Sequence, residues 1–216
     1  MPQVYADETV TIELLPGLGA YANNSYIVRT VAGGDVVIVD VPEGFGTVLE
    51  ALGDQHERVT HVIVTHSHFD HWAGYEVMRG QISAPVYAGA AETELDGSRD
   101  IQRLADSDDI VVGDGAIRVL HTPGHTPGSI SLLVGGAVLT GDTLFPGGPG
   151  RTPSHEALQQ EISSITSRLH TLPDQTLVLP GHGDSTTVGV SKAEYAIFAA
   201  SDHPADLHGD VLWLES

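Results

Sequence analysis

Side chains that can bind metal ions gather in one short stretch of this chain. The segment HSHFDH, residues 66–71, places His66, His68, Asp70 and His71 directly after the apolar run VTHVIVT. Imidazole nitrogens and carboxylate oxygens are ligands of zinc and of related divalent cations. The pattern therefore predicts a metal site immediately after a buried strand. The alternative is a polar loop in a histidine-rich chain.

Three further candidate ligands follow other apolar runs. His125 lies in HTPGHTPGS after AIRVLHT, Asp142 follows AVLTG, and His182 follows LVLPG. Glycine or proline stands beside each of them, which suits a side chain that projects from a tight turn. Functional groups gather in loops at the carboxyl ends of buried strands. We therefore expect one site to collect all of these residues.

The seven candidate ligands are more than one metal ion needs. A catalytic zinc takes three protein ligands and keeps one position for water. Seven nitrogen and oxygen donors divide into two sets of three with one carboxylate shared, so the count predicts two divalent ions. His66 and His68 can point to one ion, whereas Asp70 and His71, at the start of the next helix, turn to the other.

Composition narrows the class of protein. The chain has 216 residues and 41% apolar residues, which predicts a single soluble domain over 1–216. We expect no membrane span, because no apolar run approaches the ~20 residues that one needs. The N-terminal residues have neither the basic nor the apolar part of a secretory signal, so we expect a cytoplasmic protein.

Charge and cysteine content exclude further classes. The formal net charge is −20, from 29 acidic and 9 basic residues. Such a charge argues against a nucleic acid partner and leaves a small-molecule substrate as the expectation. The chain has no cysteine, so disulfides, thiolate nucleophiles and thiolate metal ligands are excluded.

The elements that must position the candidate ligands alternate along the chain. Apolar and β-branched runs predict strands over 9–15, 25–30, 36–41, 58–65, 84–89, 109–112, 116–122, 129–134, 137–141 and 175–180. Helical spacing and helix-ending residues predict helices over 45–56, 71–82, 155–172 and 192–201. The acidic segment 98–109 is predicted as a helix or a loop. Alternation of strands and helices predicts an α+β or α/β fold.

Four motifs together resemble a known family. THSHFDH, HTPGHTPGS, LTGDTLF and LPGHG occur in the order and at the separations typical of the metallo-β-lactamase superfamily of hydrolases. The resemblance implies a four-layer αββα sandwich with the metal site at one edge of the two sheets. It further implies a first metal on His66, His68 and His125, a second on Asp70, His71 and His182, and Asp142 bridging the two.

Within the superfamily, TGDTLF, GRT and GHGDSTT are similar to the glyoxalase II branch of thioester hydrolases. This resemblance implies a binuclear hydrolase whose ions are zinc, with Fe²⁺ or Mn²⁺ as alternatives. Metal ions lower the pKa of bound water to about 7, so we expect a bridging hydroxide to attack the carbonyl carbon of a thioester, ester or lactone. Asp70 is the expected catalytic residue, which orients that hydroxide.

Substrate contacts and two other functions stay open. Tyr21, Asn23 and Arg151 lie in loops where they can contact substrate or serve only to shape the loop. Some relatives are persulfide dioxygenases with a single iron, and His66, His125 and Asp142 match their ligands. The third possibility is a metal-binding module without catalytic activity.

Overall fold

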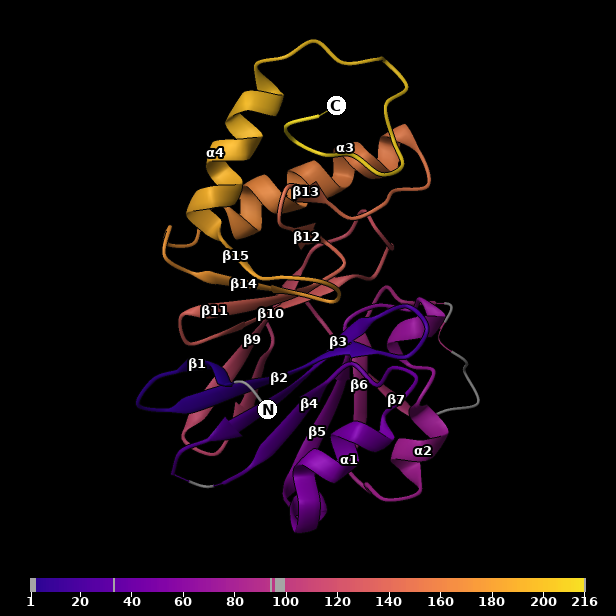
Figure 1. Cartoon of the computed structure of the whole chain (residues 1–216), viewed down its shortest axis with the longest axis vertical. Helices are drawn as coiled ribbons and strands as arrows, with labels where there is room; N and C mark the ends of the chain where they lie inside the picture. Colours follow the sequence, from indigo (N-terminus) through magenta and orange to yellow (C-terminus); the bar gives the residue numbers. More distant parts are fainter. Residues whose placement is uncertain (1–2, 33, 94, 96–99, 216) are drawn as a thin grey trace.

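The first of two β-sheets holds the N-terminal half of the chain. The computed structural model describes residues 3–32, 34–93, 95 and 100–215. Within them, seven strands pair in sequence order (Figure 1): β1 (Gln3–Ala6), β2 (Val10–Leu18), β3 (Asn23–Thr30), β4 (Val36–Val39), β5 (Val59–Val64), β6 (Val86–Gly89) and β7 (Ile101–Leu104). Strands β1 to β4 are antiparallel, and β4 to β7 are parallel.

The second sheet holds the C-terminal half. In the described residues its order is β15-β14-β11-β10-β9-β8, formed by β8 (Asp109–Val112), β9 (Gly115–His121), β10 (Ile130–Val134), β11 (Ala137–Gly141), β14 (Leu177–Pro180) and β15 (Thr186–Thr187). Strands β11 and β14 are parallel neighbours. A separate small ribbon pairs β12 (Leu144–Phe145) with β13 (Gly148–Pro149).

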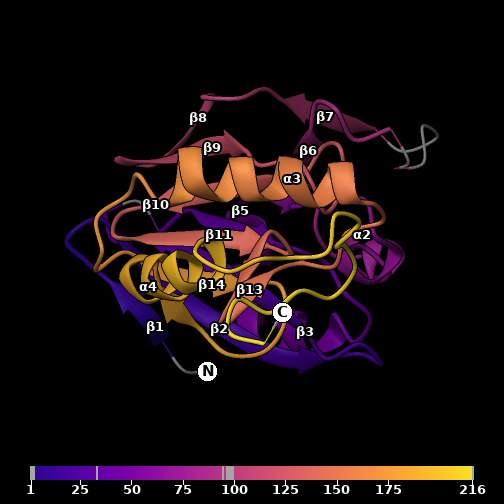
Figure 2. The same cartoon turned by 90° about the horizontal axis from the view of Figure 1, so that it is seen from above.

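Helices cover the outer face of each sheet. Helices α1 (Gly46–Leu52) and α2 (Tyr75–Arg79) lie on the first sheet, and α3 (His155–Ser164) and α4 (Val188–Ala199) lie over the second (Figures 1 and 2). Short 3-10 turns span Gly53–Arg58 and Phe69–His71, and α3 continues as a π-helix over Ile165–Leu169. None of the described helices is long and apolar enough to cross a membrane.

Three apolar layers separate these four layers of backbone. Along β4, Ile38 packs toward α1 and α2, whereas Val37 and Val39 pack between the sheets. Along β11, Leu139 faces the space between the sheets and Val138 faces α3 and α4. Both faces of these strands are buried, which explains their continuous apolar runs. The structure confirms the expected αββα sandwich.

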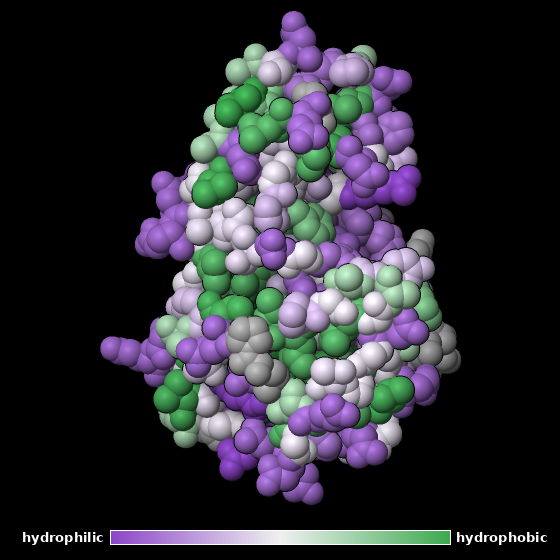
Figure 3. Space-filling view, in the orientation of Figure 1, coloured by the Kyte–Doolittle hydropathy of each residue, from purple (hydrophilic) through white to green (hydrophobic). Residues whose placement is uncertain are grey.

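The face seen in Figure 3 mixes hydrophilic and hydrophobic side chains, and hydrophobic ones adjoin one another over α4 and near the middle of the face. Exposed apolar groups are ordinary on folded proteins.

The expected helix or loop over 98–109 is wrong at its centre. Ile101–Leu104 forms β7, which pairs in parallel with β6, and Asp109 begins β8; residues 98 and 99 lie outside the described residues. Gln102 and Arg103 are exposed while Leu104 is buried. An edge strand tolerates charged side chains on its open side, so pairing with β6 prevails over the weak local preference for helix.

Candidate metal centre

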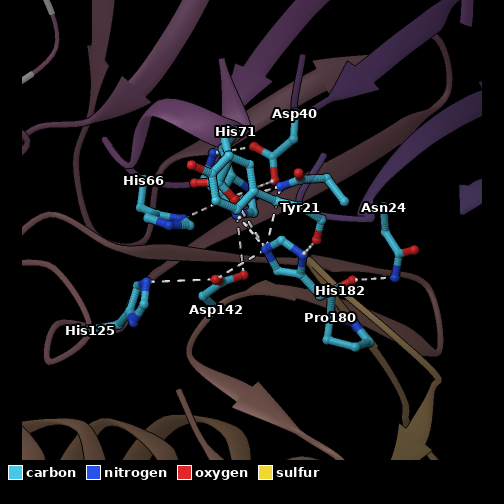
Figure 4. Close-up of polar contacts among 12 residues, drawn as sticks. Tyr21, Asn24, Asp40, His66, His71, His125, Asp142, Pro180 and His182 are labelled. Atoms are coloured by element: carbon cyan, nitrogen blue, oxygen red, sulfur yellow. Dashed lines mark hydrogen bonds and ion pairs between the residues drawn. The ribbon is translucent and has the colours of Figure 1, made fainter. Parts of the chain in front are cut away.

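Loops at the carboxyl ends of four strands bring the candidate ligands together. His66 follows β5, His125 follows β9, Asp142 follows β11 and His182 follows β14. Figure 4 shows these side chains converging from separate loops, with His71 above them. The convergence expected from the sequence therefore holds in space.

The first group is formed by His66, His68 and His125. One ring nitrogen from each lies within 4.8 Å of the others. The Nε2 atoms of His66 and His125 are buried and have no hydrogen-bond partner. A buried polar atom without a partner is costly, and a metal ion satisfies an imidazole nitrogen of this kind. The donor set and its unpartnered nitrogens fit a bound cation.

The second group is formed by Asp70, His71 and His182. Nε2 of His71 lies 3.4 Å from Oδ2 of Asp70 and 3.2 Å from Nε2 of His182. Nε2 of His182 lies 3.2 Å from the same carboxylate oxygen. Three donor atoms thus face a common point, as two imidazoles and one carboxylate do around a divalent metal.

Asp142 lies between the two groups. Its Oδ1 is 3.3 Å from Nε2 of His71, and its Oδ2 is 3.6 Å from Nε2 of His125 and 3.5 Å from Nε2 of His182. Oδ1 is buried and makes no hydrogen bond. Asp142 also forms a compact donor group with His66 and His71. One carboxylate therefore reaches both groups, as the shared ligand of two ions must.

Two glycines make room for this carboxylate and its backbone. A Cβ atom added at Gly181 would lie 2.3 Å from Oδ1 of Asp142 and 2.6 Å from Cε1 of His71. A Cβ atom added at Gly150 would lie 1.8 Å from the backbone oxygen of Asp142. The motifs LPGHG and GRT therefore need glycine because the chain passes directly against the cluster.

The second nitrogen of three histidines is held by an oxygen atom. Nδ1 of His125 donates to the carbonyl oxygen of Arg151 at 2.8 Å, and Nδ1 of His182 donates to that of Tyr21 at 3.0 Å. Nδ1 of His71 is 2.8 Å from Oδ2 of Asp40. Because Nδ1 carries the proton in each neutral ring, Nε2 presents its lone pair to the cluster.

Asp40 supports the site, and sequence analysis missed it. Besides contacting His71, its Oδ2 accepts a 2.9 Å hydrogen bond from Oγ1 of Thr65, which lies 3.1 Å from Nδ1 of His66. Asp40 thus orients one histidine of each group. The residue is 2% exposed and has a φ of 62°. An acidic residue at the end of the apolar run VVIV, like Asp142 after AVLTG, is the signal that points to it.

Each of the three candidate substrate residues lies beside a candidate metal ligand. Nδ2 of Asn23 donates to Oδ2 of Asp70 at 2.8 Å and lies 3.3 Å from Nε2 of His182. Tyr21 reaches His182 through its carbonyl group, while its side chain is exposed. The Arg151 side chain is also exposed, and its backbone holds His125. Asn23 and the two backbone carbonyls therefore position candidate ligands.

Burial and neighbouring charges shift the pKa values of the candidate histidine ligands in different directions. Burial, reinforced by neighbouring imidazoles, lowers the pKa of His66 and of His125, so both rings are neutral and able to bind metal. For His182, burial opposes the charged form, but hydrogen bonds to Asp142 and Asp70 raise its pKa to about 9. Without metal, a proton on this ring therefore balances the adjacent carboxylates.

A second buried acid, Glu161, also escaped sequence analysis. It lies on α3, is 0% exposed, and neither carboxyl oxygen has a partner in hydrogen-bonding geometry. Burial first, and then the charge of Asp142, raise its pKa to about 9, while the nearby amides of Gly150 and His125 partly offset both effects. Its spacing from the buried Leu158 and Ile165 places it on the apolar face of the helix, which is the signal that reveals it.

Comparison with known proteins finds relatives that are named as hydrolases. The chain is 40% identical over 147 residues to the "Probable metallo-hydrolase YqgX" of Bacillus subtilis, covering 59% of this chain and 70% of that protein. It is 35% identical over 162 residues to a hydroxyacylglutathione hydrolase of Cereibacter sphaeroides, covering 74% of this chain and 62% of the hydrolase.

A solved structure shares most of the architecture. The di-iron-bound form of TTHA1623 superposes with a TM-score of 0.70 at 28% identity, covering 82% of this chain and 96% of that one. The family model of the metallo-beta-lactamase superfamily matches residues 18–182, which include the histidine- and aspartate-rich clusters described above. The αββα sandwich, the converging donors and this match agree: the chain is a metal-binding member of the metallo-beta-lactamase superfamily.

Proposed function

We propose that this protein is a dinuclear metal-dependent hydrolase that cleaves thioesters, or the related esters and lactones. The position of Asp142 between the two donor groups carries this proposal, because a carboxylate that reaches both groups joins the seven candidate ligands into one site for two ions. In the proposed arrangement, one ion is held by His66, His68 and His125, and the other by Asp70, His71 and His182. Asp142 is shared, and zinc is the expected metal.

Divalent cations bound here would lower the pKa of water so that hydroxide is available near neutral pH, and they would stabilise negative charge on a carbonyl oxygen. The side chains of the protein orient the attacking water. Burial opposes ionisation of Asp70, but hydrogen bonds from His182 and Asn23 and the charge of His71 prevail and lower its pKa. Asp70 therefore stays a carboxylate, which orients the attacking water by accepting a hydrogen bond from it.

The proposed reaction consumes one water per substrate. The water oxygen bonds to the acyl carbon, the carbon–sulfur bond breaks, and the departing thiolate takes a proton. A carboxylic acid and a thiol result, so the chain needs neither a serine nor a cysteine nucleophile. Similarity to a hydroxyacylglutathione hydrolase supports thioesters as the substrate class.

Elemental analysis combined with a substrate panel tests the proposal. The protein is purified, its metal content per chain is measured, and hydrolysis of thioesters, lactones and phosphodiesters is followed. We expect two metal ions per chain and turnover of thioesters. Two bound ions with no hydrolysis of any panel member would overturn the proposal in favour of a metal-binding module.

A second candidate function is iron-dependent oxidation, because the relative TTHA1623 binds iron in this fold. In that case His66, His125 and Asp142 would hold a single iron, since two histidines and one carboxylate form the usual ligand set of non-haem iron oxygenases. One iron per chain, together with oxygen uptake in the presence of a persulfide, would decide for this function.

A further inference from the structure

A cavity beside the metal centre has one apolar wall. Its volume is about 350 Å³, within the range of small-molecule sites. His125, Asp142 and His182 are among its lining residues, so the cavity opens directly onto both donor groups. The apolar part of the lining consists of Phe145, Pro146, Pro149, Val211 and Leu212.

The segment after α4 supplies part of this wall and is anchored firmly. Trp213 is 1% exposed, and its ring centroid lies 4.8 Å from that of Phe198 on α4. Its backbone nitrogen donates to the carbonyl oxygen of Gly147 at 2.7 Å. A Cβ atom added at Gly148 would lie 2.5 Å from the carbonyl oxygen of Val211. These contacts hold the segment against the loop that follows β12.

Leu212 is 44% exposed although its chain neighbours Val211 and Trp213 are each 1% exposed. An apolar side chain kept partly in water by a fixed backbone gains free energy when a ligand covers it. The wall is therefore preformed, and an apolar ligand group does not have to order it first.

Charge at the cavity does not favour an anionic substrate. Arg151 is the only lysine or arginine among the described residues that line it. Its Nε lies 3.8 Å from Oδ2 of Asp210, which lines the same cavity, and both side chains are largely exposed. The protein also carries a net charge of −20, so the surrounding field repels anions.

We propose that this cavity binds the apolar, uncharged acyl chain of a thioester whose carbonyl group lies at the metal centre. The inference rests on the proposed function and specifies its substrate class. A group attached to the carbonyl carbon has a short path into the cavity, because the cavity touches both donor groups. Longer acyl chains then bury more apolar surface, while a terminal carboxylate loses its hydration without gaining an unpaired cation.

A homologous series of substrates tests this directly. The metal-loaded protein is assayed with N-acetylcysteamine thioesters carrying acetyl, butyryl, hexanoyl and adipoyl groups, where adipoyl matches hexanoyl in length but ends in a carboxylate. We expect kcat/KM to rise roughly threefold to fourfold per methylene up to hexanoyl. We expect adipoyl to react at least about tenfold more slowly than hexanoyl.

Two variants of the same segment locate the effect. Leu212→Ser should flatten the dependence of kcat/KM on chain length, whereas Leu214→Ser should leave it unchanged. Leu214 is 56% exposed and is not among the cavity residues. Leu214→Ser therefore controls for the loss of an exposed leucine outside the cavity. A further readout needs no turnover: the thioether S-hexyl-N-acetylcysteamine should bind the metal-free protein in calorimetry with a negative heat-capacity change, more weakly after Leu212→Ser.

The possible failures are distinguishable. If no thioester is hydrolysed, thioesters are removed from the proposed function and the acyl-site inference falls with them. If acetyl and hexanoyl thioesters react equally fast, or adipoyl reacts faster than hexanoyl, the proposed function stands and the apolar acyl site is wrong. Equal effects of Leu212→Ser and Leu214→Ser would also refute the assignment of this wall.

Discussion

Glutamine in place of Glu161 should stabilise the metal-free protein at neutral pH. The folded-state pKa of Glu161 is raised from 4.5 to about 9, so the folded chain retains a proton that the unfolded chain releases above pH 4.5. Stability therefore falls as pH rises between these two values. At about 1.4 kcal/mol per pH unit above pH 4.5, the free energy of unfolding is lower by about 3 kcal/mol at pH 7. Glutamine has nearly the same shape as the protonated acid and does not titrate.

Urea unfolding at pH 5, 6, 7 and 8 in the presence of a chelator measures this difference. We expect the free energy of unfolding of Glu161→Gln to be higher than that of the natural protein by less than about 1 kcal/mol at pH 5 and by up to about 3 kcal/mol at pH 7. The chelator is needed because cations near Asp142 would favour ionisation of Glu161. The control is Glu156→Gln, which changes an exposed acid of the same helix. Because the pKa of Glu156 is lowered, the effect of this substitution on stability should not vary between pH 5 and pH 8. A gain from Glu161→Gln that stays constant from pH 5 to 8 would refute the buried, neutral acid.

Three further predictions concern the metal centre. Asp142→Ala should remove one metal equivalent per chain and most of the activity; full occupancy by elemental analysis with unchanged kcat would contradict a shared ligand. Asp40→Asn should weaken metal binding by about 10- to 100-fold, because His71 loses its charged partner; competition with a chelating dye measures this, and equal affinity would remove Asp40 from the site. Metal affinity should rise with pH from 6 to 9, because the pKa of His182 is raised to about 9 and the ion must displace its proton. Calorimetry in buffers of different ionisation enthalpy counts the released protons, and a pH-independent affinity with no proton release would contradict this protonation.

The sequence by itself determined the types of the candidate ligands and where each lies along its strand. Apolar runs such as VVIV and AVLTG identify strands buried on both faces, and the residue that follows such a run lies at the edge of the sheet. This local relation is enough to predict that His66, His125, Asp142 and His182 converge, because strand direction and turn chemistry are properties of short segments.

Only the tertiary structure decided what surrounds those ligands. Asp40 contacts His71 across 31 positions of the chain, and the segment around Leu212 lines the cavity beside the metal centre while Trp213 packs on α4. Glu161 occupies an apolar helix face whose burial depends on the second sheet, and β7 forms because β6 offers it an open edge. Such contacts depend on which elements become neighbours in space, and local residue patterns carry no direct record of that.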